Sequence, residues 1–99
     1  MNVLNSDGLL LHSARRGAER YGFELDNKEY AALSVQIAFH ELTGEDGYVR
    51  LSNAGGGREK WAVWFKGEWI PVVFDTLEGR IVTLLPGHEL RRFRYKLPW

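Results

Sequence analysis

The chain has 99 residues, of which 44% are hydrophobic and 26% are charged. This balance is typical of a globular domain and excludes disordered and fibrous chains, so we expect one domain over residues 1–99. The 13 basic and 13 acidic side chains cancel, and a neutral chain lacks the overall field that attracts polyanions, which counts against nucleic acid as a partner.

The chain contains no cysteine, so disulfides and thiolate metal sites are excluded. The start of the chain has no basic region before its leucines, and no apolar run reaches the length of a membrane span. We therefore expect a soluble, cytoplasmic protein without a membrane partner.

Residues 1–11 show no clear pattern, and two helices are predicted within residues 12–44. Ser13 can cap a first helix that runs to Tyr21 and is closed by Gly22. Arg16 and Arg20 lie one turn apart on this helix, with His12 a further turn back.

The second predicted helix runs from a cap at Asp26 or Asn27 to about Leu42. Its apolar residues form two adjoining stripes that should lie across a sheet: Ala31, Val35, Ala38 and Leu42, and Tyr30, Leu33 and Ile37. His40 lies near the C-terminal end, where complementing the helix dipole is favoured over a catalytic role.

Residues 48–86 alternate as four strands joined by connections too short to contain a crossover helix, so the sheet should be antiparallel. The strands are predicted at 48–52, 61–65, 69–74 and 81–85. The fold class is thus α+β: two N-terminal helices packed on one face of a four-stranded antiparallel β-meander, followed by a basic C-terminal tail.

Alternation assigns Trp61, Val63 and Phe65 to the face covered by helices and leaves the other face open to solvent. Pro71 lacks an N–H, which predicts a sheet edge or a bulge there. Residues 55–57 are consecutive glycines and indicate a mobile hairpin tip. A phosphate-binding P-loop is not favoured, because a strand follows these glycines instead of a helix.

The tail, residues 87–99, concentrates positive charge. From residue 88 onwards it holds four basic side chains and one acidic, a net charge of +3, which leaves −3 for residues 1–87. Basic and aromatic side chains together suit phosphates and stacked bases, but the same mixture is found where a terminal segment packs on its own domain. The candidates for binding nucleic acid or a partner, on the open face and the tail, are Lys60, Trp64, Trp69, Arg91, Arg92 and Arg94.

No metal or cofactor site is predicted, because the three histidines lie far apart without accompanying carboxylates at ligand spacing. A set suited to metal-independent phosphodiester cleavage remains: His12, Arg16, Arg50 and Thr83. Such cleavage needs a group that titrates near neutrality to move a proton, and fixed cations to hold the charge of the phosphorane. The alternative is that His12 is an ordinary surface residue beside an arginine-rich helix.

Two stretches carry a family resemblance. Residues 12–23, HSARRGAERYGF, resemble the opening of small phage and bacterial members of the barnase, EndoU, colicin and RelE-like nuclease superfamily. Residues 72–75 with residues 80–86 resemble the closing hairpin of the same proteins. The resemblance implies RNA cleavage, with His12 as acid and base, Arg16 and Arg50 on the phosphate, and Thr83 hydrogen-bonded to substrate.

Functions of different classes therefore compete. One is a metal-independent ribonuclease of toxin or phage type. The second is an inactive protein of the same fold, with a phage gene as one origin, that binds and inhibits a host protein. A third is a structural or accessory protein, for which the sequence holds no positive signal. Trp64 and Trp69 serve either of the first two functions, because large aromatic side chains stack on bases and also anchor protein interfaces.

Overall fold

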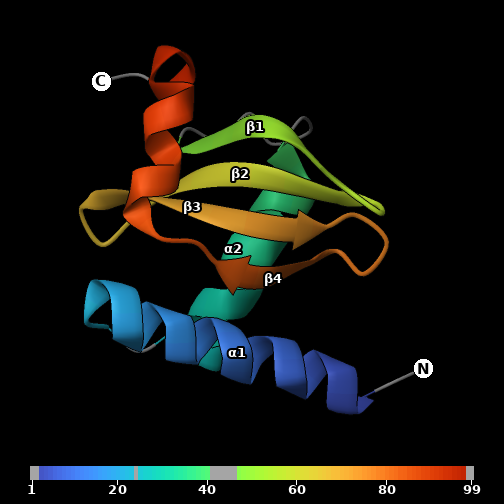
Figure 1. Cartoon of the computed structure of the whole chain (residues 1–99). Helices are drawn as coiled ribbons and strands as arrows, with labels where there is room; N and C mark the ends of the chain where they lie inside the picture. Colours follow the sequence, from blue (N-terminus) through green and yellow to red (C-terminus); the bar gives the residue numbers. More distant parts are fainter. Residues whose placement is uncertain (1–2, 24, 41–46, 98–99) are drawn as a thin grey trace.

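The computed structural model describes residues 3–23, 25–40 and 47–97. Two helices precede the strands and a 3-10 segment follows them: α1 (Val3–Tyr21), α2 (Asn27–Ala38), β1 (Tyr48–Gly55), β2 (Arg58–Phe65), β3 (Glu68–Asp75), β4 (Arg80–Leu84) and η1 (Gly87–Lys96). The strands form one sheet in chain order with every neighbouring pair antiparallel (Figure 1). The predicted α+β meander is confirmed.

The tight turns follow from residues with positive φ. Lys66 and Gly67, at φ 50° and 84°, join β2 to β3, and this pair of positive values is the type I′ turn that matches the twist of a hairpin. Gly56 and Gly57 make the corresponding turn between β1 and β2. Strand β1 therefore continues to Gly55, beyond its predicted end at residue 52.

Helix α2 begins where the sequence predicts. Asp26 is its N-cap: the Asp26 side chain accepts a hydrogen bond from the Glu29 N–H at 2.8 Å, and the Glu29 carboxylate accepts one from the Asp26 N–H at 3.1 Å. Such a capping box typically contributes about 1 kcal/mol. The helix ends at Ala38, and residues 41–44 of the predicted range lie outside the described residues.

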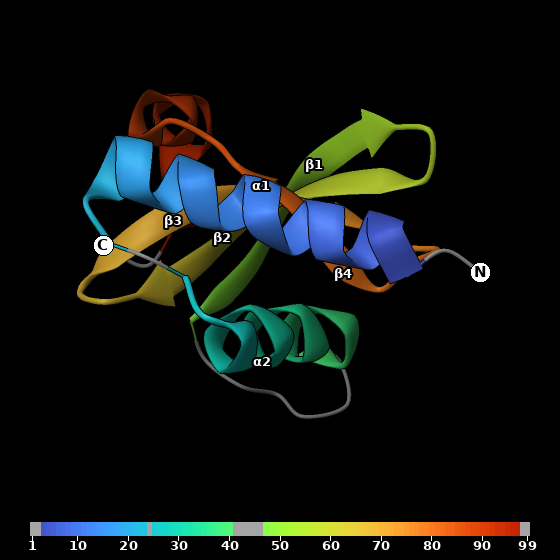
Figure 2. The same cartoon turned by 90° about the horizontal axis from the view of Figure 1, so that it is seen from below.

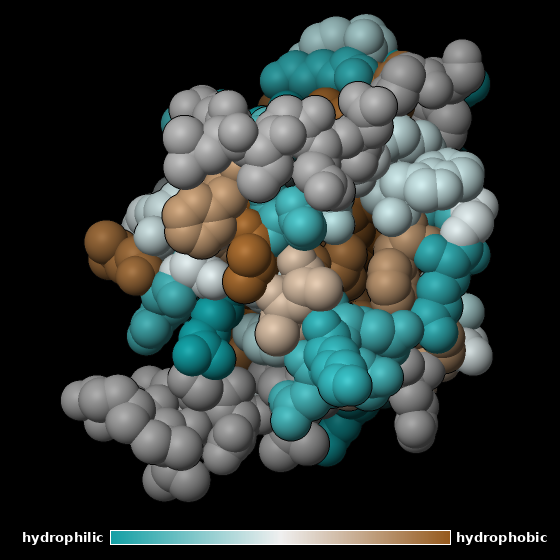
Figure 3. Space-filling view, turned by 180° about the vertical axis from the view of Figure 1, so that it is seen from behind, coloured by the Kyte–Doolittle hydropathy of each residue, from teal (hydrophilic) through white to brown (hydrophobic). Residues whose placement is uncertain are grey.

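One of the two apolar stripes predicted on α2 faces the core. Tyr30, Leu33 and Ile37 are buried, whereas the side with Ala31, Val35 and Ala38 is exposed, so the prediction for that side was wrong. A single sheet can cover only one side of a helix. On α2 the covered side consists of Tyr30, Leu33 and Ile37 together with the buried Ser34. Figure 3 looks onto the molecule from behind and shows hydrophobic surface between hydrophilic patches.

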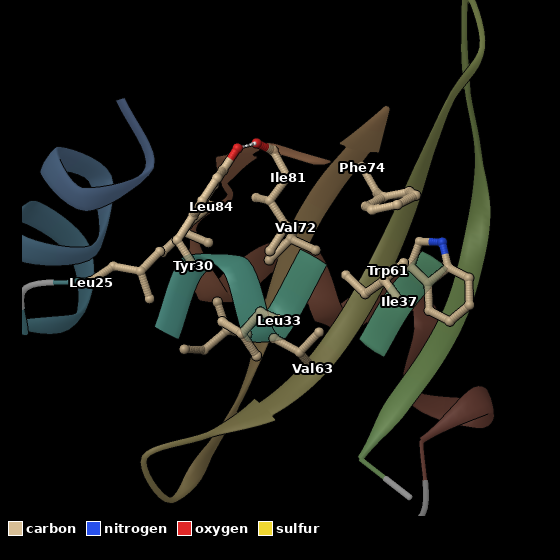
Figure 4. Packing of buried hydrophobic residues seen from close by; sticks show 11 residues of the cluster. Leu25, Tyr30, Leu33, Ile37, Trp61, Val63, Val72, Phe74, Ile81 and Leu84 are labelled. Carbon is tan, nitrogen blue, oxygen red and sulfur yellow. Dashed lines mark hydrogen bonds between the residues drawn. The ribbon is translucent and has the colours of Figure 1, made fainter. Parts of the chain in front are cut away.

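The main core lies between α2 and one face of the sheet. Trp61, Val63, Val72 and Phe74 project from the strands toward Leu33 and Ile37 (Figure 4). The face predicted from alternation is therefore the buried one. Leu9, Ala14, Tyr21 and Phe23 pack against the same cluster from α1 and the segment that follows it.

Helix α1 is longer than predicted: it begins at Val3, so residues 3–11, which show no clear pattern in the sequence, are helical and Ser13 is not a cap. Ser13 is buried in the middle of the helix. Gly8 and the short polar residues before it have weak helix propensity, which hides the helix in the sequence. Packing of Leu9 on the core supplies a stabilisation that local propensity does not reveal.

Helix α1 lies along β4, at the last strand of the sheet (Figures 1 and 2). Gly17 allows this close approach, because a Cβ there would stand 3.1 Å from the Phe23 ring and 3.4 Å from Leu84 Cδ1. A glycine that weakens the isolated helix thus brings it against the strand. The described helices include none long and apolar enough to cross a membrane.

The second face of the sheet is covered in part by η1, so the expectation of a fully open face was wrong. Leu90 and Leu97 form a smaller core with Leu51 and Ala62, and α2 and η1 lie on opposite sides of the sheet (Figure 2). The tail thus packs as two short 3-10 turns joined at Phe93, where the backbone leaves helical geometry.

Pro71 lies in the inner strand β3, so the predicted sheet edge at this position was wrong. Its carbonyl accepts from the Leu85 N–H at 2.7 Å. The residues of a hydrogen-bonded antiparallel pair normally exchange both bonds, but proline has no N–H to return. The Tyr21 hydroxyl donates to the Leu85 carbonyl instead, at 2.5 Å.

Candidate active site

A hollow lies on the α2 side of the sheet, where the end of α2 meets β1 and β2. This main pocket has a volume of about 560 Å³, within the usual range for small-molecule and nucleotide sites. Its polar lining residues are His40, Arg50, Glu59 and Thr76, and the indole of Trp61 and the ring of Phe74 line it beside them.

Strand register gathers three of these side chains. Arg50 of β1 is the cross-strand partner of Trp61 of β2, and residues opposite each other in a sheet share a face. Glu59 precedes Trp61 by two residues and so projects to the same side. His40 reaches the pocket from just beyond the C-terminal end of α2.

Glu59 holds the arginine in place. Its Oε2 accepts from Arg50 Nε at 2.8 Å, while its Oε1 accepts from Trp61 Nε1 at 3.1 Å. Asn53 Oδ1 accepts a further hydrogen bond from Arg50 Nη2 at 2.7 Å. A guanidinium has five N–H donors, so these two bonds orient Arg50 and leave donors for an anion in the pocket.

The protonation of Glu59 follows from these contacts. Burial alone would raise the pKa of its carboxyl, but hydrogen bonds from Arg50 and Trp61 and the charge of Arg50 outweigh burial and lower that pKa. Glu59 is therefore a carboxylate at neutral pH. A carboxylate stabilised in this way is a weak base, so its chemistry is to position Arg50 and not to accept protons.

His40 is half-buried, and its imidazole packs edge-to-face against Trp61 with ring centroids 5.4 Å apart. Within the described ranges, its buried Nδ1 has no hydrogen-bond partner. The imidazole edge that carries Nδ1 is therefore turned into the protein, and the rest of the ring lines the pocket. His40 and Glu59 thus contact the same indole.

The structure does not bring the predicted catalytic set together. Only Arg50 of that set lines the main pocket. His12 and Arg16 belong to α1, which lies along β4, whereas Arg50 is on β1 at the opposite edge of the sheet. Arg16 forms an ion pair with Glu19 at 2.6 Å on its own helix.

Thr83 is also separate from the pocket. It is the partner of Val73 across β3 and β4, on the face that carries η1, and its hydroxyl faces the Leu84 carbonyl at 3.4 Å. On α1, burial and then the neighbouring arginines, Arg16 foremost, lower the pKa of His12. His12 is thus uncharged at neutral pH, beside the arginines of its own helix.

The predicted binding set, in contrast, gathers on one side of the sheet, the η1 face. Lys60 pairs with Glu89 of η1 at 3.3 Å, and Trp64 packs edge-to-face on Trp69 with centroids 5.5 Å apart. Trp64 keeps 52% of its surface exposed. The three arginines of the set, Arg91, Arg92 and Arg94, belong to η1 and are exposed.

Sequence reasoning missed His40 and Glu59 as site residues. Glu59 could have been found, because it shares the alternation of Trp61 and lies near the partner strand that carries Arg50. His40 could not, since its position depends on how α2 crosses the sheet. Across residues 3–23, 25–40 and 47–97, no three His, Asp or Glu side chains form a cluster able to hold a metal ion.

No family model matches the chain, and it has no match among curated proteins or solved structures. The resemblance to the barnase, EndoU, colicin and RelE-like superfamily therefore rests on the two short stretches alone. Function has to be argued from the pockets and surfaces of this chain.

Proposed function

We propose that the chain is a ribonuclease whose site is the main pocket, with His40 as the proton-transfer residue and Arg50 as the phosphate-binding residue. The observation that carries this proposal is the convergence of a half-buried histidine and a positioned arginine in one hollow of about 560 Å³. This volume accommodates a nucleotide, and the aromatic rings of Trp61 and Phe74 suit a base.

The reaction is an internal transesterification. His40 takes the proton of the ribose 2′-hydroxyl, and the 2′ oxygen attacks the adjacent phosphorus. The bond from phosphorus to the 5′ oxygen of the next nucleotide breaks, and the imidazolium returns the proton to that oxygen. The products are a 2′,3′-cyclic phosphate and a free 5′-hydroxyl, with His40 restored.

Arg50 stabilises the charge that develops on the phosphorane oxygens, and Glu59 is the positioning residue that holds the guanidinium. A bidentate guanidinium suits phosphate geometry better than an ammonium does. Trp61 fixes the second oxygen of Glu59 and packs against His40, so one buried indole links both parts of the site.

The direct test incubates the purified protein with mixed RNA and, separately, with DNA of the same sequences, both in the presence of a chelator. We expect cleavage of RNA only, with cyclic phosphate ends detected by mass spectrometry, because the 2′-hydroxyl is the nucleophile. Intact RNA after prolonged incubation with well-folded protein would falsify the proposal.

The η1 face supports a second candidate, a binding protein without catalysis. Trp64 and Tyr95 are exposed at 52% and 78%, beside exposed arginines of η1. Exposed aromatic and arginine side chains are enriched at the hot spots of protein interfaces. This candidate predicts that an interface with a host protein is lost in Trp64→Ala and kept in His40→Ala, measured by the affinity for that partner.

A further inference from the structure

A second hollow adjoins the main pocket at the tips of two hairpins. This tip pocket has a volume of about 360 Å³ and is lined by Asn53, the backbone of Gly55, Gly56 and Gly57, Arg58, Glu59 and Thr76. Glu59 and Thr76 also line the main pocket. The two hollows therefore share a wall, and a ligand that fills one lies next to the other.

Hydrogen bonds connect the two loops that form the walls of the tip pocket. The Gly57 carbonyl accepts from the Thr76 N–H at 2.9 Å and from the Thr76 hydroxyl at 2.6 Å, which ties the β1–β2 turn to the β3–β4 loop. Asp75 Oδ1 in turn accepts from the N–H groups of Leu77 and Glu78. Both loops are thus held by hydrogen bonds.

The chemistry of the tip pocket suits one nucleotide. The glycines place bare backbone along the wall, where a flat base can approach closely. The Arg58 side chain is 48% exposed and bonds Asp75 through Nε at 3.4 Å, so its two terminal nitrogens are left for stacking on a base or for contact with a phosphate. Asn53 adds a side-chain amide at the border with Arg50.

We infer that the tip pocket binds a nucleotide that adjoins the two nucleotides whose shared bond is cleaved in the main pocket. The substrate is then a single-stranded oligonucleotide that spans both hollows, and a dinucleotide fills the main pocket alone. The inference rests on the proposed function in one respect, which is that the bond is cleaved in the main pocket and not in the tip pocket. Binding in the tip pocket itself is measurable without cleavage.

The test compares 2′-O-methyl oligouridylates, which cannot be cleaved, as a dinucleotide and a tetranucleotide. Titration calorimetry should give the wild-type chain an affinity for the tetranucleotide about tenfold higher than for the dinucleotide, because one additional base can stack in the tip pocket. Arg58→Ala should reduce this ratio nearly to one and leave the dinucleotide affinity unchanged. Arg15→Ala, which removes an exposed arginine of α1, should keep the wild-type ratio.

Equal affinities in the wild type, an unchanged ratio in Arg58→Ala, or no binding of either oligonucleotide would overturn the inference. Because the probes are uncleavable, a failure to cleave RNA counts against the proposed function and leaves this measurement intact. A melting curve of Arg58→Ala that matches the wild type shows that the loops have kept their structure.

Discussion

The two edges of the sheet are treated in opposite ways. At the β4 edge, side chains of the two helices bond backbone groups of the strand. From α1, Arg20 donates to the Leu84 carbonyl at 2.5 Å. From α2, Tyr30 donates to the Ile81 carbonyl at 2.6 Å, and Ser34 Oγ accepts from the Ile81 N–H at 3.1 Å. At the β1 edge, Lys96 Nζ bonds the Leu51 carbonyl, and the main pocket opens beside it.

This difference favours the β1 side of the sheet over the arginine-rich first helix as the place of the proposed site. Unpaired strand edges expose N–H and C=O groups that must be satisfied by water or by the protein. At β4 the edge lies against α1, and Arg20 and Tyr21 of that helix donate hydrogen bonds to the Leu84 and Leu85 carbonyls. At β1 the edge faces outward, so Arg50 can serve a ligand.

The largest effect should come from the histidine on the β1 side. His40→Ala should slow RNA cleavage by about 10²- to 10⁴-fold, the usual contribution of a positioned acid or base. His12→Ala, the matched change at the β4 side, should leave the rate near that of the wild type. Steady-state kinetics on one RNA measures both, and a larger loss for His12→Ala would restore the site expected from the sequence.

Breaking the sealed edge should reduce stability. Tyr30 is buried, and burial raises its pKa to about 12, so its hydroxyl is a neutral donor to the Ile81 carbonyl. Tyr30→Phe leaves that buried carbonyl without its donor, at a cost of about 1–3 kcal/mol in the free energy of unfolding. Urea denaturation measures the loss.

The control for this change is Tyr95→Phe, at an exposed tyrosine of η1, which should alter stability by less than about 0.5 kcal/mol. Equal effects of the two substitutions would mean that the hydrogen bond at the β4 edge does not stabilise the fold.

The loop between β3 and β4 should make stability depend on pH. Backbone hydrogen bonds, the one from Glu78 foremost, lower the pKa of Asp75 below its ordinary value of 3.8. The contribution of this carboxylate to stability is therefore complete above its pKa in the unfolded chain. It is lost as the pH falls through its lower pKa in the folded protein. We expect about 1–2 kcal/mol in total for these charge-assisted bonds.

Chemical denaturation of the wild type and of Asp75→Asn from pH 7 to pH 2 isolates this carboxyl, because Glu59 titrates in both proteins. The difference in stability between the two should be constant above about pH 5 and shrink below the ordinary carboxyl pKa. A difference that grows toward acid pH would contradict the assignment.

The smallest effect is expected at the open edge. Lys96→Ala removes the hydrogen bond to the Leu51 carbonyl, which water can replace in part, so stability should fall by about 0.5–1 kcal/mol. Arg92→Ala, at an exposed neighbour on η1, serves as the control. Thermal melting compares the two, and an equal or larger loss for Arg92→Ala would show that Lys96 does not secure this edge.

Local patterns in the sequence were sufficient for the strands, their antiparallel order, the buried face with Trp61 and Val63, and the start of α2 at Asp26. Alternation, turn glycines and capping are short-range signals, and each acts through neighbours within a few residues. The same signals misplaced the start of α1. They also predicted that the stripe with Val35 is buried, whereas it is exposed, because the burial of a helix face depends on partners that are distant in the sequence.

By itself, the sequence therefore determined the four strands, their buried face and the start of α2, and it identified Arg50 as a candidate. The tertiary structure decided that α1 covers the β4 edge, that η1 covers the second face, and that His40 meets Glu59 and Trp61 at the other edge. These residues are far apart along the chain. Their convergence depends on how α2 crosses the sheet, and core packing sets that arrangement rather than any local pattern.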